Sequence, residues 1–174
     1  MIVMMAGLPG TGKSTLSRAL AVALNGAVVD KDTVRAALFD EFVDYSREQD
    51  DLAMESVYSA AVYLARSRAV FIDGRAFALR EQWERGLTVA SVVIETVCLE
   101  ETARARIEAA KGEHLAGNRT FQLFLELKAR REPITAPKLQ VNTERPLKDC
   151  VRECVEHMVT AGFKTTHGTL GGTV

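Results

Sequence analysis

The sequence has no apolar run of the ~18 residues that a membrane-spanning helix requires. Its first residues, MIVMMAG, carry no basic flank, and their apolar run is too short for a secretion signal. We therefore expect a cytoplasmic protein that makes no contact with a membrane.

Positive charge is not in excess either, because 22 Lys and Arg residues face 23 Asp and Glu residues and the net charge is −1. A chain that binds long nucleic acid usually has a basic surplus, so this balance favours a small partner molecule and leaves a local basic cleft open. Cysteine is scarce: Cys98, Cys150 and Cys154 are odd in number and have no partner at zinc-ligand spacing. Three reduced, mostly buried thiols are expected.

The length and composition are typical of one globular domain: the chain has 174 residues, of which 47% are hydrophobic and 26% charged. Short apolar runs alternate along the chain with segments of helical periodicity, which predicts a parallel sheet covered by helices. We assign residues 1–163 to the domain and residues 164–174, which are glycine-rich and aperiodic, to a flexible tail. The expected strands are 2–6, 27–30, 69–73, 91–98 and 138–143.

The strongest motif follows the first expected strand. Gly7 and the run Gly12-Lys13-Ser14 fit the phosphate-binding pattern Gly-x-x-x-x-Gly-Lys-Ser/Thr, with a strand before it and a helix after it. Glycines let backbone amides turn toward phosphate oxygens, and the N-terminus of the helix adds positive potential. We expect the Lys13 ammonium to act on the β- and γ-phosphates and the Ser14 hydroxyl to bind Mg²⁺. The predicted nucleotide-binding residues here are Gly10, Thr11, Gly12, Lys13, Ser14 and Thr15.

Three aspartates end the next strands or follow them closely, namely Asp30, Asp32 and Asp73. In an open parallel sheet, ligands bind outside the carboxyl ends of the strands. Asp73 follows the apolar run AVFI, and we expect it to hold Mg²⁺ or a metal-bound water. The alternative is a capping or turn role.

The stretch VVDKDTVR places Asp32 two residues past the second strand and Arg35 one helical turn later on the same face. A carboxylate that faces the γ-phosphate can accept a proton from an attacking hydroxyl. A guanidinium beside it can orient an anionic group of the acceptor. The alternative is that Asp32 caps the helix and pairs with Arg35 within it.

Four stretches, GLPGTGKSTL, DKDTVRAALF, VFIDGRAF and VNTERPL, together resemble the small P-loop kinases, which include polynucleotide 5′-hydroxyl kinases, chloramphenicol phosphotransferase and zeta-toxin-like enzymes. The resemblance in order and spacing covers residues 2–160. It implies a single P-loop NTPase domain of the α/β class. It also implies a five-stranded parallel sheet of order 2-3-1-4-5, flanked by helices, with a short lid at 109–120 after the fourth strand.

The same resemblance implies roles for single residues. Asp32 would be the general base, and Arg35 would bind the acceptor. Where the family commonly has Asp-Ala/Gly-Thr after the third strand, this chain has Asp73-Gly74-Arg75. The departure places the extra charge of Arg75 beside the metal or the acceptor.

Phosphoryl transfer needs cations around the migrating group, and in this family the segment after the fourth strand supplies them. The candidates are Arg104, Arg106, Lys111 and Arg119. Arg104 and Arg106 are two residues apart and cannot share a helix face, so one of them points inward. We favour Arg106 and Arg119 as catalytic residues, together with Lys13 and Asp32.

The loop VNTERP at 141–146 follows the fifth strand, and the resemblance places it beside adenine. Thr143 and Arg145 are therefore predicted to bind the nucleotide. The sequence has no Asn-Lys-x-Asp signature for guanine, which favours ATP over GTP.

The acceptor pocket is expected near LFDEFVDYSREQDD, where aromatic residues lie among acids. We expect Tyr45, with Arg35 and Arg75, to bind the acceptor, because an aromatic ring can stack on a base, a sugar face or an aromatic drug. The acids would repel a polyanion unless they face solvent.

The leading hypothesis is a kinase that uses ATP and Mg²⁺ to phosphorylate a hydroxyl of a small molecule, with no obligate protein partner. One alternative is a polynucleotide 5′-hydroxyl kinase. Another is an ATPase switch, although this length shows no second domain. A nucleotide-binding module without catalysis is the third, and the intact Lys13, Ser14, Asp32 and Asp73 argue against it.

Overall fold

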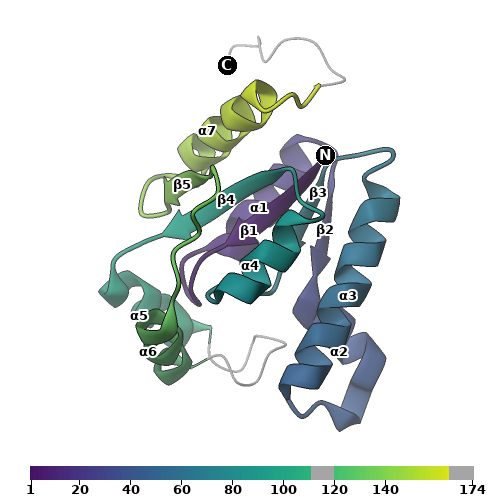
Figure 1. Cartoon of the computed structure of the whole chain (residues 1–174). Helices are drawn as coiled ribbons and strands as arrows, with labels where there is room; N and C mark the ends of the chain where they lie inside the picture. The colour runs from purple at the N-terminus through teal and green to yellow at the C-terminus, as the bar shows by residue number, and fades with distance from the viewer. Residues whose placement is uncertain (111–119, 165–174) are drawn as a thin grey trace.

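Five parallel strands form the centre of the computed structural model, which describes residues 1–110 and 120–164 (Figure 1). Their spatial order is β2-β3-β1-β4-β5. The strands are β1 (Ile2–Ala6), β2 (Ala27–Asp30), β3 (Val70–Asp73), β4 (Val92–Val97) and β5 (Leu139–Asn142). The helices are α1 (Lys13–Ala23), α2 (Lys31–Phe39), the 3-10 turn η1 (Asp40–Phe42), α3 (Arg47–Leu64), α4 (Arg80–Leu87), α5 (Glu100–Ala109), α6 (Phe121–Arg130) and α7 (Leu147–Thr160).

The predicted fold class and strand order are therefore confirmed, and each strand lies within one residue of its predicted ends. Residues 111–119 of the predicted lid and residues 165–174 of the predicted tail lie outside the described residues. In the part of the chain that is described, no helix has the length and apolar character needed to cross a membrane.

The sheet is covered on both faces, which explains why β1 is apolar at every position. Ile2 and Met4 pack with α3 and α4 through residues such as Val57 and Trp83. Successive strand residues point to opposite faces. Met5 accordingly packs in a second cluster, with α1 and α7. Because β1 is packed on both faces, it holds the start of the loop that follows it in a fixed position.

The pair α5 and α6 lies beyond β4 and joins the loop after β1 through a third cluster of Leu8, Ile107 and Phe124. The chain after α6 returns to the sheet past Glu95, which is 1% exposed and pairs with Arg131 and with Lys138 at 2.9 Å. Burial alone would raise the pKa of Glu95, but the two cations outweigh it and hold the pKa below its usual value.

Candidate active site

A cavity of about 580 Å³ opens at the carboxyl ends of the strands, between the loop after β1, the start of α2 and the first turn of α3. A second cavity of about 330 Å³ lies between α1 and the loop after β5. Gly12, Thr15 and Arg106 line both. The two cavities therefore adjoin on the outer side of the phosphate loop.

The phosphate loop, residues 7–15, depends on backbone shapes that favour glycine. Gly10 and Gly12 have φ of 78° and 88°, and a Cβ atom at Gly10 would lie 2.6 Å from the Ala103 carbonyl oxygen. Only glycine adopts this region without strain. The turn delivers the chain directly into α1, so the amides of the loop and of the first helical turn face the cavity together.

Two side chains of the loop bond to the loop itself. The Lys13 Nζ donates to the carbonyl oxygens of Gly7 at 2.7 Å and Leu8 at 2.9 Å. The Thr11 hydroxyl donates to Leu8 and lies 2.8 Å from the Thr96 hydroxyl, behind the loop. The Thr11 amide also donates to the Leu8 carbonyl, at 3.3 Å, and Thr11 is not among the residues that line the two cavities.

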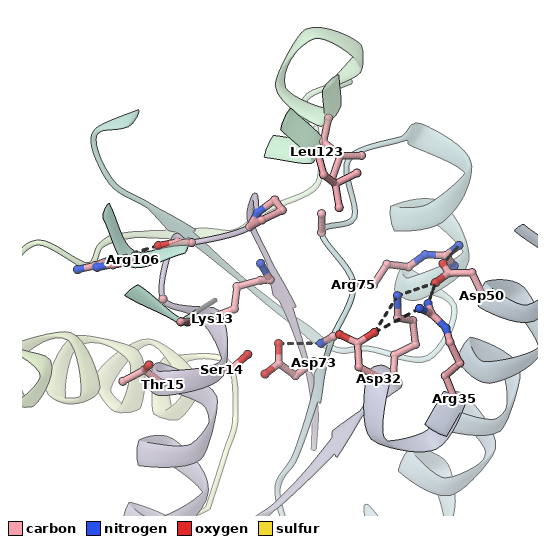
Figure 2. Close-up of a pocket in the computed structure, with 18 of the residues that line it drawn as sticks. Lys13, Ser14, Thr15, Asp32, Arg35, Asp50, Asp73, Arg75, Arg106 and Leu123 are labelled. Carbon is pink, nitrogen blue, oxygen red and sulfur yellow. Dashed lines mark hydrogen bonds and ion pairs between the residues drawn. The ribbon is translucent and has the colours of Figure 1, made fainter. Parts of the chain in front are cut away.

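Ser14 and Asp73 lie at the bottom of the cavity, near Lys13 (Figure 2). The hydroxyl of Ser17 links them, because its single hydrogen can be donated to Asp73 Oδ2 at 3.0 Å or to the Ser14 carbonyl at 3.1 Å. Asp73 is fully buried, and its Oδ1 accepts from the Gly74 amide at 2.8 Å.

This pair fits Mg²⁺, which usually keeps several waters and takes one or two protein ligands plus phosphate oxygens. Within residues 1–110 and 120–164, no group of three or more His, Cys, Asp and Glu side chains could hold a metal ion. A buried carboxylate beside a serine at the phosphate loop is a site with few protein ligands, of the kind that binds Mg²⁺ together with nucleotide phosphates.

The start of α2 rules out the alternative in which Asp32 caps the helix, although Asp32 does pair with Arg35 within it, at 3.7 Å. Asp30, not Asp32, is the N-cap: its Oδ1 accepts from the amides of Asp32 at 2.8 Å and Thr33 at 3.1 Å. The helix begins directly after β2, so the last strand residue has the extended backbone that a cap requires. Burial, followed by the negative charge of Asp73, raises the pKa of Asp30. Because Asp30 satisfies these amides, the Asp32 carboxylate is released to face the cavity.

Asp32 lies between the phosphate loop and a group of charged residues on α2 and α3 (Figure 2). Its Oδ1 is 3.4 Å from Lys31 Nζ and 3.7 Å from Arg35 Nη1. This oxygen is buried and accepts no hydrogen bond from any described residue. An oxygen in such a state is suited to accept a proton or hydrogen bond from a bound molecule.

Lys31, Arg35 and Arg75 form what we call the cation cluster, and each of these residues is at most 8% exposed. All three contact Asp50 of α3: Lys31 at 2.5 Å, Arg75 at 2.8 Å, and Arg35 through its Nη2. Tyr45 lies over Arg35, with its ring centre 5.2 Å from the guanidinium carbon. The three residues predicted for acceptor binding, Arg35, Arg75 and Tyr45, thus lie together beside Asp32.

Sequence reasoning missed Lys31 and Asp50. The acidic stretch was expected to face solvent or repel a polyanion, and its outer members Asp40, Glu41 and Asp44 are indeed exposed. Asp50, however, lies four residues before Met54 and seven before Val57, which are buried. That helical spacing places Asp50 on the inner face of α3. The inward orientation of Asp50 could therefore have been predicted from the sequence.

The nucleotide side of the loop holds the other predicted residues. Arg106 Nη1 donates to the Thr143 hydroxyl and Nη2 to the Thr143 carbonyl, both at 2.9 Å. The Thr143 hydroxyl in turn donates to the Thr11 carbonyl at 2.8 Å. Arg145 lines the second cavity and pairs with Glu153. Thr143, Arg145 and Arg106 therefore surround that cavity.

Of the two arginines on α5, only one points inward, as expected. Arg104 is 60% exposed and pairs with Glu108 at 2.9 Å. Arg106 lies on the outer side of the phosphate loop, away from Asp32 (Figure 2), and would have to leave Thr143 to reach a terminal phosphate near Lys13. Lys111 and Arg119 lie outside the described residues.

Comparisons with known proteins agree with this architecture. Residues 2–134 match the family described as an AAA domain. No curated protein matches the sequence.

Several solved structures share the fold. The APS kinase of Mycobacterium tuberculosis, in complex with AMPPNP and APS, has a TM-score of 0.68 at 16% identity, covering 91% of this chain and 96% of that one. Shikimate kinase from Bacteroides thetaiotaomicron has a TM-score of 0.67 at 16% identity, covering 91% and 98%. Kti12 of Chaetomium thermophilum, in complex with ADP-AlF3, has a TM-score of 0.69 at 15% identity, covering 92% and 97%.

Proposed function

Because the chain belongs to the AAA domain family, we propose that it is an ATP-dependent kinase that transfers the γ-phosphate to a hydroxyl of a small acceptor. One observation supports this most directly. Asp32 lies in the same cavity as the phosphate loop, with a buried oxygen that accepts no hydrogen bond from the described residues. A cluster of three buried cations lies beyond that carboxylate, on the side away from the phosphate loop, where an acceptor could be held (Figure 2).

In the proposed reaction, the acceptor oxygen attacks the γ-phosphorus and forms a P–O bond, while the bond to the β–γ bridging oxygen breaks. The hydroxyl proton passes to Asp32, and ADP leaves with the electron pair of the broken bond. Lys13 would turn from its own loop to the β- and γ-phosphates. Bound Mg²⁺ would neutralise phosphate charge, held by Ser14 and Asp73.

The remaining residues would position the two substrates. Thr143 and Arg145 would border the adenine end in the second cavity, and the loop amides of Gly10 to Thr15 would hold the phosphates. Arg106 would approach the nucleotide from the outer side of the loop, and Arg119 is proposed as a further cation. Arg35, Arg75 and Tyr45 would contact the acceptor.

A transfer assay with labelled ATP tests the proposal. The protein would be incubated with a panel of small alcohols and, separately, with a 5′-hydroxyl oligonucleotide. We expect label on a small alcohol and ADP release above the rate with water alone. Label on the oligonucleotide would replace the proposal with the polynucleotide alternative. Release of inorganic phosphate without any labelled product would favour an ATPase switch.

A further inference from the structure

The cation cluster has more donors than its own partners use. Arg35 and Arg75 each have an Nε that is shielded from solvent and makes no hydrogen bond of good geometry with a described residue, although the Tyr58 hydroxyl lies beside the Arg75 guanidinium. The two residues are 4% and 8% exposed, and both line the main cavity. A buried donor without a partner is rare in proteins because it costs about 1–3 kcal/mol. These atoms indicate that the cluster is built for a group beyond those it now contacts.

Asp50 is the carboxylate that holds the cluster together. Its Oδ1 accepts from Lys31 at 2.5 Å and from Arg35, and its Oδ2 lies 2.8 Å from Arg75. Burial would raise the pKa of this carboxyl, yet Lys31 and Arg75 outweigh burial and the pKa lies below its ordinary value. One carboxylate between three cations occupies the position that a bound oxyanion would take.

The other acids near the cluster are placed differently. Asp32 is farther away: its Oδ1 lies 3.4 Å from Lys31 Nζ and 3.7 Å from Arg35 Nη1, and the residue lines the cavity between the cluster and the phosphate loop (Figure 2). Asp51 contacts Arg75 at 2.8 Å, but its side chain is 49% exposed and is shared with Arg47. Asp50 belongs to the first turns of α3, outside the sheet. Its side chain can therefore move away from the three cations without disturbing a strand.

We propose that Lys31, Arg35 and Arg75 form the binding site for an oxyanion group of the acceptor, and that Asp50 occupies this site until the acceptor displaces it. The inference rests on the proposed function and narrows its substrate class to small alcohols that carry a carboxylate or a phosphate. The incoming group takes over the contacts of Asp50 and also accepts from the two Nε atoms. Asp50 then turns to solvent at the helix N-terminus, where a negative charge is favourable.

The geometry also explains why the acceptor's hydroxyl would reach Asp32. Asp32 lies between the phosphate loop and the cluster (Figure 2), and Arg35 contacts both Asp32 and Asp50. An acceptor anchored through its anion at the cluster would present the rest of its length toward the γ-phosphate. Anchoring of this kind contributes to catalysis by orientation.

The test is an anion titration that needs no phosphoryl transfer. The phosphate loop is first filled with Mg²⁺·AMPPNP, so that added anions cannot bind there, and acetate or inorganic phosphate is titrated by NMR. A tethered competitor has an effective concentration of millimolar or more, so Asp50→Asn should lower the dissociation constant at least roughly tenfold. Glu48→Gln, which removes one negative charge at an exposed position in the first turn of the same helix, should leave the constant within about twofold of the original protein.

The outcomes separate the two proposals. Tightening for acetate alone assigns a carboxylate, tightening for phosphate alone assigns a phosphate, and both results support the site even if no alcohol is phosphorylated. Unchanged constants in Asp50→Asn, or an equal change in Glu48→Gln, overturn it even if transfer is found. In the transfer assay, hydroxy acids should be phosphorylated in preference to their neutral amides.

Removal of Asp50 leaves three buried cations without their shared partner and can prevent folding. The unaltered protein then provides the answer through hydrogen exchange. With Mg²⁺·AMPPNP bound, acetate should accelerate exchange of the amides of residues 47–51, because Asp50 leaves the cluster, while the strands keep their protection. Exchange at 47–51 that stays constant or slows would overturn the displacement of Asp50.

Discussion

The two ends of the main cavity are built in opposite ways. At the nucleotide end, the surface is mostly backbone, shaped by Gly10 and Gly12 and continued by the first turn of α1. At the cation cluster, the surface consists of charged side chains from α2, α3 and the loop after β3. The first kind of surface follows from a short local sequence, whereas the second exists only after distant segments pack. Under the proposed function, the first end would bind phosphate in general and the second would select the acceptor.

The largest effect is expected where the two ends meet. Asp32→Asn keeps the shape of the side chain but removes its capacity to take a proton, so kcat should fall by about 10²–10⁴. The affinity for Mg²⁺·ATP should stay within about twofold, because the phosphate loop is untouched. Transfer assays and an equilibrium titration with nucleotide measure the two quantities.

Asp30→Asn is the matched control, since asparagine also caps helices and the position lies two residues away. It should retain most of the transfer activity. An Asp32→Asn variant that transfers phosphate at the original rate would remove Asp32 from the role of base.

A smaller effect should be confined to the nucleotide end. Arg106→Ala removes two hydrogen bonds to Thr143 at 2.9 Å and a positive charge that lines both cavities. We expect KM for ATP to rise roughly tenfold, the size of one charge-assisted hydrogen bond, with KM for the acceptor unchanged. Steady-state kinetics with each substrate varied in turn measure both constants.

Arg104→Ala, the same change on the exposed face of α5, should leave these constants as they are. A large fall in kcat for Arg106→Ala with unchanged affinity for ATP would contradict the placement beside Thr143. It would support a role at the migrating phosphoryl group, as sequence reasoning expected.

The smallest effect is on the pH dependence of folding stability. One group near each end of the cavity contributes to it, and the two contributions are lost in opposite directions of pH. Lys31 and Arg75 outweigh burial and lower the pKa of Asp50, so its stabilising contribution is present above its ordinary pKa of 3.8 and is lost as pH falls below it. Burial raises the pKa of Cys154, on α7 behind the nucleotide end, from 9.0 to about 12. Its contribution is therefore present below pH 9.0 and is lost as pH rises toward 12.

Urea unfolding at a series of alkaline pH values measures the second of these contributions. The free energy of unfolding should fall by about 1 kcal/mol between pH 9 and 10 because of Cys154 alone. Cys154→Ala should be less stable at neutral pH and should lack this part of the slope, so the difference between the two proteins should narrow as the pH rises above about 9. An identical slope in both proteins would show that other groups cause the alkaline loss.

Local patterns in the sequence were sufficient for the strands and the phosphate loop, whereas the order of the strands came from the resemblance to the small P-loop kinases. A strand buried on both faces is apolar throughout, and the loop motif prescribes its own backbone. The cap of α2 was missed by two residues, because Asp30 and Asp32 are both good caps and only the end of β2 decides between them. Element ends are where sequence signals are weakest.

The cation cluster was only half predictable, for a physical reason. Arg35 and Arg75 could be placed near strand ends, but their common partner Asp50 lies 15 residues after Arg35, beyond η1, in a stretch of acids that resembles a solvated surface. Its inward orientation follows from the apolar face of α3. Which cations it meets depends on how α3 packs, and no local pattern contains that information.

Asp30 and Asp32 have separate roles, since Asp30 caps the N-terminus of α2 and Asp32 lines the cavity. A lineage can therefore replace the residue at 32, and with it the chemistry, without giving up the helix that presents it. Loss of Asp30 would instead fray that helix, whatever residue stood at 32. New activities can thus arise here by single substitutions in a scaffold that survives each change.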